Sequence, residues 1–104
     1  MSATYTFEAV LWEHDGPAAW HFVTLPAEYA DEIAAAQEGR ATGFGSVRVE
    51  AAIGGTRWAT SLFPDTGRGS YVLPVKKAVR TAENLGAGST AKVTLVVPAP
   101  EPGG

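Results

Sequence analysis

The sequence predicts one mainly β domain, a closed barrel of about six strands with two short helices. Three observations favour this class: short segments that alternate apolar and polar residues, a well-defined hairpin over residues 46–63, and two strands that each end in Leu-Pro before a helix. The 104 residues, 45% of them hydrophobic, suffice to bury one core. We expect the domain to occupy residues 1–97 and the Pro/Gly-rich tail 98–104 to be disordered.

The first half of the chain contains two expected strands and one helix. Apolar residues alternate with polar ones over 5–11, which is typical of a half-buried strand. That strand ends at the turn 14–17, where Asp-Gly favours positive φ and a proline cannot continue a ladder. A second strand is expected over 19–25. A helix is expected over 26–38, begun by a proline at its first turn and followed by a loop over 39–45.

The hairpin over 46–63 turns at Gly54-Gly55, which suits a two-residue type I′ turn. One register sorts both strands, and a slip of one residue would reverse every side chain. The face expected to be core pairs Val47 with Leu62, Val49 with Thr60, Ala51 with Trp58 and Ile53 with Thr56. The other face of the hairpin carries Arg48 across from Ser61.

The second half repeats the pattern of the first. A turn over 64–69 leads into a strand over 70–73, and a short helix follows Pro74. Gly86 is the expected C′ residue of this helix, and the last strand is expected over 91–97. The helix has apolar positions at Val75, Ala78, Val79, Ala82 and Leu85, with Lys76, Lys77, Arg80 and Glu83 on the side expected to be exposed.

The two Leu-Pro corners suggest an internal repeat. Leu25-Pro26 and Leu73-Pro74 are 48 residues apart, and the same offset relates Ala30 to Ala78. One such unit cannot bury its own apolar face, whereas two units closing on each other can, and closure removes exposed sheet edges. The alternative is that the match of a common dipeptide is coincidental.

Three segments carry a resemblance to a known family: WEHDGPAAW at 12–20, WATSLFP at 58–64 and, most specifically, GSYVLPVKKAVR at 69–80. Over nearly its whole length except the tail, the chain resembles the bacterial domain-of-unknown-function family 1905. The resemblance implies a double-split β-barrel, a single-chain relative of the swapped-hairpin dimers of AbrB- and MazE-like transcription factors. The family motif often continues with Gly-Asp where this chain has Gly88-Ser89, so that turn is expected to differ. The resemblance implies no established function.

Composition excludes several kinds of site. The absence of cysteine rules out disulfides and thiolate metal sites. No apolar stretch is long enough to span a membrane and no leader is recognised, so a cytoplasmic protein without membrane contact is expected. The formal charge of −3 divides into −6 over residues 1–50 and +3 over residues 51–104. The overall balance argues against broad nucleic-acid binding and leaves a local anionic partner on the second half as a hypothesis.

A basic helix is the first candidate binding site. Lys76, Lys77 and Arg80 lie in its early turns, and the preceding turn contains Arg68. Helix N-termini attract anions, and side-chain cations add to that attraction. The pattern indicates a contact for a phosphate, a carboxylate or nucleic acid. The alternative is a solvated helix face, paired electrostatically with the acidic first helix.

Aromatic residues form the second candidate. Trp12 is out of phase with the apolar positions of its strand, so it is expected to face outward and to line a pocket or partner surface with Trp20. Tyr71 is grouped with them, whereas the hairpin register assigns Trp58 to the core. The alternative for the outward residues is ordinary packing at the edge of the core.

A polar sheet face is the third candidate. Arg48, Ser61 and Arg57 share the face that the hairpin register turns away from the core. They could form an anion-accepting floor beneath a ligand. An ordinary exposed sheet face explains them equally well.

No catalytic or metal-binding motif stands out. His14 and His21 are the two histidines, and the run from Glu13 to Asp15 holds consecutive groups that rarely converge on one ion. No cofactor and no metal are expected. The leading hypothesis is a non-enzymatic binding module, a monomer or weak dimer, for an anionic small molecule or a protein partner. DNA binding of the AbrB type, by fold analogy, and a small hydrolase or isomerase that uses Arg48, Ser61 or His21 are the alternatives.

Overall fold

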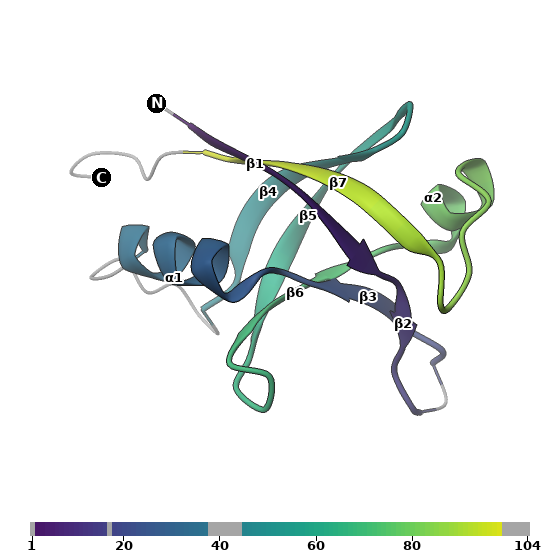
Figure 1. Ribbon diagram of the computed structural model, residues 1–104, viewed down its shortest axis with the longest axis horizontal. Coiled ribbons are helices and arrows are strands. Elements are labelled where there is room, and N and C mark those ends of the chain that lie inside the picture. The colour runs from purple at the N-terminus through teal and green to yellow at the C-terminus, as the bar shows by residue number, and fades with distance from the viewer. Residues whose placement is uncertain (1, 17, 38–44, 99–104) are drawn as a thin grey trace.

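The computed structural model describes residues 2–16, 18–37 and 45–98, and these form a mainly β domain with two short helices (Figure 1). The prediction of a mainly β domain with two short helices is therefore confirmed. The expected loop over 39–45 lies outside the described residues except for Gly45, as do the expected helix end at Glu38 and residues 99–104 of the expected tail. In chain order the elements are β1 (Ala3–Val10), β2 (Trp12–Glu13), β3 (His21–Thr24), α1 (Ala27–Ala36), β4 (Val47–Ile53), β5 (Thr56–Asp65), β6 (Ser70–Pro74), α2 (Lys77–Ala82) and β7 (Thr90–Val97).

The seven described strands form one antiparallel sheet in the order β1-β7-β4-β5-β6-β3-β2, curled into a half-barrel. The two helices lie at opposite ends of the molecule's long axis (Figure 1). Neither of these described helices is long and apolar enough to cross a membrane. The sequence prediction of about six strands misses β2, because the chain breaks its ladder after Val10 and resumes pairing, now with β3, at Trp12.

The break between β1 and β2 is held by the turn before the last strand. Leu11 donates its N–H to the carbonyl oxygen of Ser89 and accepts a hydrogen bond from the N–H of Gly88, both at 2.8 Å. Both backbone groups of this buried residue are therefore satisfied outside the regular ladders. One continuous segment thus occupies both ends of the strand order, next to β7 over β1 and next to β3 over β2.

The β4–β5 hairpin has the predicted register at every pair, from Ile53 opposite Thr56 to Val47 opposite Leu62. The face predicted to be core is buried except at Thr56 and Thr60, which are half-buried, and Trp58 is only 7% exposed. The predicted type I′ turn is wrong, because that turn requires positive φ at both central residues. Gly54 has a φ of +59° while Gly55 is not in the positive region, which is the pattern of a type II′ turn.

The two strands that end in Leu-Pro lie side by side, and the two corners are at opposite ends of this antiparallel pair. β3 pairs with β6 so that Val23 lies opposite Leu73, and the N–H of Leu25 extends this ladder to the carbonyl oxygen of Tyr71 at 3.0 Å. Pro26 begins α1 directly, since its carbonyl oxygen accepts the N–H of Ala30. The second strand is shorter than expected, because pairing starts at His21 rather than residue 19.

Helix α2 differs from its prediction at both ends. Lys76 remains extended, with ψ of 160°, so the helix begins at Lys77 rather than directly after Pro74. The expected C′ glycine is also wrong: Asn84, not Gly86, takes the left-handed conformation, with a φ of +56°. The N–H of Leu85 reaches the carbonyl oxygen of Arg80, and that of Asn84 reaches Thr81, as in a Schellman motif.

The core lies inside the curl of the sheet and is mostly aliphatic, with Phe7, Trp58 and Tyr71 among its members. Helix α1 contributes Ala30 and Ile33, and α2 contributes Val79. Ala78 and Ala82, expected on the buried side of α2, are exposed because the helix is only six residues long and touches the core through a single turn. The side chains buried most completely are Leu11, Ile33, Leu62, Leu73, Leu95, Val23, Val75, Val79 and Val93.

Replacing Gly54 with alanine should lower the free energy of unfolding by about 2–3 kcal/mol. A Cβ at Gly54 would overlap the carboxylate of Glu83, which accepts a 2.6 Å hydrogen bond from the Thr56 hydroxyl, and would sit on a backbone with positive φ. Urea titration monitored by tryptophan fluorescence measures the loss. Gly55→Ala is the matched control, because a Cβ there meets nothing within 4 Å. Equal losses in the two variants would contradict this account of the turn.

Replacing Asn84 with alanine should cost about 1 kcal/mol of stability, whereas Asn84→Gly should retain it. The reason is the left-handed backbone that ends α2 at this residue. Gly86→Ala serves as the comparison and should change stability by less than about 0.5 kcal/mol, since an added Cβ there has no neighbour within 4 Å. Thermal unfolding of the three variants checks the assignment, which fails if Gly86→Ala is the most damaging.

Candidate functional site

A cleft opens where strands β5 and β6 separate. The two strands pair only from Phe63 opposite Val72 to Asp65 opposite Ser70. Beyond that point β5 continues along β4 alone, while β6 continues along β3 toward α2. The cleft occupies the space between the diverging segments, and we refer to it below as the β5–β6 cleft.

A proline explains why the ladder stops. The register that places Phe63 opposite Val72 would place Ser61 opposite Pro74 in the next hydrogen-bonded pair. Proline has no N–H to donate, so that pair would lack one of its two hydrogen bonds. On the side facing β3, Pro74 lies opposite Phe22. The ladder bonds on this side are made by neighbouring residues, such as the N–H of Leu25 and the N–H of Val75, so the pair of Pro74 with Phe22 needs no donor from proline. Pro74 therefore permits the β3–β6 ladder and ends the β5–β6 ladder.

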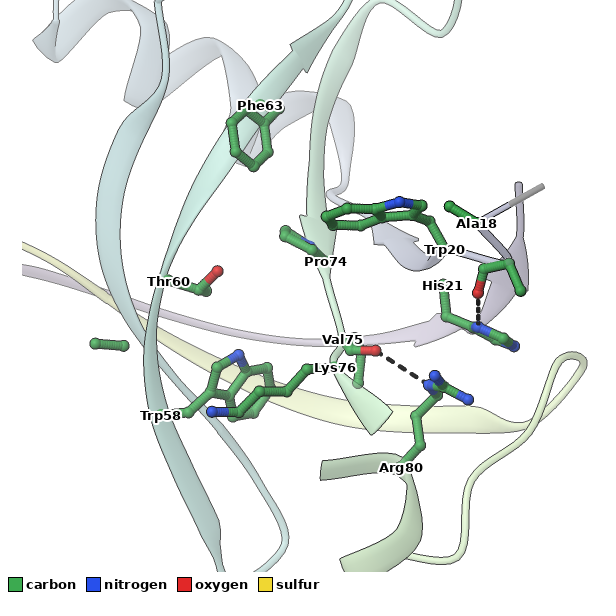
Figure 2. Close-up of a pocket in the computed structure, with 12 residues that line it drawn as sticks. Ala18, Trp20, His21, Trp58, Thr60, Phe63, Pro74, Val75, Lys76 and Arg80 are labelled. Carbon is green, nitrogen blue, oxygen red and sulfur yellow. Dashed lines mark hydrogen bonds between the residues drawn. The ribbon is translucent and has the colours of Figure 1, made fainter. Parts of the chain in front are cut away.

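The β5–β6 cleft has a volume of about 370 Å³. Figure 2 shows side chains of β5 along one side and residues of the segments leading into β3 and α2 along the other. Most of its walls are apolar, with one hydroxyl and two cations among them. The lining residues are Ala18, Ala19, Trp20, His21, Trp58, Ala59, Thr60, Phe63, Pro74, Val75, Lys76 and Arg80.

Three aromatic side chains define the interior of the cleft. Trp58 is buried and forms part of the floor, where it belongs to the core as predicted. Trp20 and Phe63 are instead 54% and 42% exposed, although they are large and apolar. Exposed aromatic side chains gathered at a concave site are typical of a binding surface rather than of ordinary protein surface.

Two cations lie at the α2 end of the cleft. Lys76 is exposed at the helix N-cap position, and Arg80 is half-buried one turn later rather than fully exposed as expected. The Nε of Arg80 donates a 3.1 Å hydrogen bond to the carbonyl oxygen of Val75, which fixes the guanidinium beside the cleft (Figure 2). In the described part of the chain, no carboxylate lies within 4 Å of either cation. Their charge is therefore available to an anion.

The segment that carries Trp20 is held in a strained turn. Ala19 has a φ of +50°, a left-handed conformation that side chains other than glycine rarely adopt. Its carbonyl oxygen lies 2.9 Å from Nδ1 of His21, and the carbonyl oxygen of Trp20 accepts the N–H of His14 at 2.8 Å. Backbone strain that the surroundings enforce is concentrated at functional sites. Here the strained turn places Trp20 at the mouth of the cleft.

A second cluster of side chains adjoins the cleft. The indole of Trp12 packs on Phe22 with ring centroids 5.1 Å apart and donates a 2.9 Å hydrogen bond to Thr24. The guanidinium of Arg68 lies 3.9 Å from the centre of the Trp12 ring. On the other side, Phe22 stacks on Trp20 at 6.1 Å with an interplanar angle of 12°. This cluster packs against Trp20 through Phe22. The indole N–H of Trp12 and the guanidinium of Arg68 already have partners within the cluster.

The structure brings together only part of the site expected from the sequence. Trp20, Lys76 and Arg80 meet in the β5–β6 cleft. Trp12 and Arg68 belong to the adjoining cluster, where Arg68 also pairs with Asp65 at 3.3 Å.

The remaining predicted residues lie elsewhere. Arg48 and Ser61 are opposite each other on the sheet face that turns away from the core, and Arg57 lies farther along β5, the strand of Ser61. Tyr71 is buried and packs in the core. Lys77 is exposed and does not line the cleft.

Sequence reasoning missed Thr60 and Phe63 as cleft residues and treated Trp58 as core alone. The hairpin register placed Thr60 and Trp58 on the buried face, which is correct, but it did not reveal that the neighbouring strand departs there. The available signal was Pro74, a residue without a backbone donor at the end of the strand predicted over 70–73. Phe63, an apolar residue out of phase with Leu62, was a second signal.

The arrangement suits binding of a ligand with two parts. The aromatic and aliphatic walls can cover an apolar group, while Lys76 and Arg80 can hold a negative charge at one end. Among the described residues, no group of three or more His, Asp or Glu side chains is placed to hold a metal ion.

Comparison with known proteins gives a family but no activity. The family model described as domain of unknown function (DUF1905) matches residues 7–95, which include every lining residue of the β5–β6 cleft. No curated protein is detectably similar to this sequence. Since the family model covers most of the chain, this protein belongs to the DUF1905 family.

Proposed function

We propose that the protein is a binding module whose β5–β6 cleft takes an organic anion with an apolar or aromatic body. The observation that carries the proposal is the combination of exposed aromatic walls, Trp20 and Phe63, with two cations that lack a carboxylate partner among the described residues.

The physical chemistry favours a ligand that satisfies both parts at once. Covering apolar surface is favourable by about 25 cal/mol per Å² removed from water. A charge contact to an exposed lysine adds only about 0.2–1 kcal/mol, because solvent screens it. The half-buried guanidinium of Arg80, held by Val75, is the better-ordered anion partner. Affinity should therefore come mainly from the apolar body, and selectivity for anions from the two cations.

The proposed architecture behind this site is a closed, double-split barrel of two related halves, distantly similar to AbrB- and MazE-like proteins. Two strand pairings support it. Residues 24 and 72, which are 48 positions apart, face each other in the β3–β6 pair. Residues 50 and 96, which are 46 positions apart, face each other in the β4–β7 pair. A single approximate dyad through both pairs would relate the β1–β2 segment to β5 and make the two Leu-Pro corners equivalent.

This relation is proposed for the fold and not for DNA binding. The cations of α2 border a cleft with aromatic walls, which suits a small ligand better than a duplex. A DNA-binding surface would give an affinity that falls steeply with salt concentration.

The binding proposal predicts that 3-phenylpropanoate raises the melting temperature and changes the tryptophan fluorescence, whereas the neutral 3-phenylpropanamide binds at least about tenfold more weakly. Lys76→Ala should weaken binding of the anion about threefold. Lys77→Ala is the matched control, because this neighbouring lysine lies outside the cleft. Isothermal titration at low salt gives the affinities.

Three outcomes would overturn this function. The first is equal affinity for the acid and the amide, which would leave the cations without a role. The second is an equal effect of Lys76→Ala and Lys77→Ala, which would indicate nonspecific attraction to α2 rather than binding in the cleft. Failure of Phe63→Ala to weaken binding would exclude the aromatic wall in the same way.

A further inference from the structure

The β5 strand has an unpartnered edge inside the cleft. In a two-residue hairpin, the residues that flank the turn form a hydrogen-bonded pair, here Ile53 and Thr56. Hydrogen-bonded pairs then alternate along an antiparallel ladder. Thr60 therefore directs its N–H and C=O toward β4, while Ala59 and Ser61 direct theirs toward the cleft. Within the described residues, no strand pairs with β5 at these two positions on that side.

We infer that the β5–β6 cleft takes the C-terminal end of a polypeptide, which adds to the edge of β5 as a short extra strand and places its terminal carboxylate at Lys76 and Arg80. This inference rests on the proposed function, because it names the class of anion that the cleft binds. Backbone groups at an exposed strand edge give affinity for extended peptides, and pockets beside the edge give selectivity.

The position of the cations sets the direction of the peptide. Continuing the β5–β6 register past Pro74 brings Lys76 level with Ala59, so the carboxylate lies beside Ala59. The peptide then runs antiparallel to β5, as β6 does farther along, with its last residue at Ala59 and its antepenultimate residue at Ser61. The chain leaves the cleft near Phe63, where β5 and β6 rejoin.

The walls match the alternation of side chains in a strand. Successive residues of a strand point to opposite faces of the sheet. Trp58 and Thr60 lie on the core side of β5, whereas Phe63 lies on the outer side near the mouth that Trp20 borders (Figure 2). A penultimate residue, level with Thr60, would therefore pack on the core side against Trp58 and Val75, and an antepenultimate residue, level with Ser61, would lie on the outer side between Trp20 and Phe63. A free aromatic acid fills these walls without using the edge of β5.

The test compares four forms of one peptide, acetyl-Ala-Phe-Ala-Val. The free acid should bind more tightly than 3-phenylpropanoate, and its C-terminal amide should bind at least about tenfold more weakly than the acid. An N-methyl group on the last residue removes the N–H that would donate to Ala59 and should weaken binding about tenfold. The matched control carries the N-methyl group on the penultimate residue, whose N–H points away from β5, and should bind within about threefold of the parent.

Amide hydrogen exchange provides a readout that does not depend on affinity. The N–H groups of Ala59 and Ser61 should exchange more slowly when the acid peptide is bound and should not change with 3-phenylpropanoate. Equal binding of the two N-methyl peptides, or unchanged exchange at Ala59 and Ser61, would overturn the inference. If 3-phenylpropanoate still binds in the cleft, the proposed function stands although the peptide inference has failed. If neither 3-phenylpropanoate nor the acid peptide binds, the proposed function fails as well.

Discussion

The missing N–H of Pro74 is the constraint on which the cleft depends. A ladder between β5 and β6 would otherwise continue to Ser61 and close the sheet over Trp58 and Thr60. Because proline cannot donate that hydrogen bond, β6 follows β3 alone and the chain passes on to Val75 and α2. The opening therefore follows from the covalent structure of one residue and does not require a mobile loop.

The same dipeptide has different consequences at the two corners. After Leu25, Pro26 starts a helix at once, because its carbonyl oxygen accepts the first helical N–H groups. After Leu73, two further extended residues separate Pro74 from α2, and the N–H of Val75 first bonds to the carbonyl oxygen of His21. This extended segment, Val75 and Lys76, places the Lys76 side chain at the rim of the cleft. The delayed helix start, which the Leu-Pro pattern alone does not predict, is what places a cation beside the cleft at this corner.

Sequence patterns predicted the parts of the fold that local chemistry determines. Alternation in both strands fixed the β4–β5 register, since any slip would bury Arg48 and expose Val49. The patterns failed where two residue types could serve equally well, as when Asn84 rather than Gly86 ends α2. They also failed where pairing ends for a nonlocal reason. Trp20, Lys76 and Arg80 were expected at a binding site, but Thr60 and Phe63 join them only because β5 and β6 separate there.

The exposed aromatic side chains are best understood together with the residues that support them. Trp20 stacks on Phe22, which packs on Trp12, and the indole of Trp12 is held by Thr24 and covered by Arg68. A side chain fixed from behind loses little conformational freedom when a ligand covers its front. The strained backbone at Ala19 serves the same end, because it orients Trp20 before any ligand arrives. The backbone of Phe63 is held by the last pair of the β5–β6 ladder, where it lies opposite Val72. One wall of the cleft is thus ordered by the aromatic cluster and the strained turn at Ala19, and the other by the end of the β5–β6 ladder.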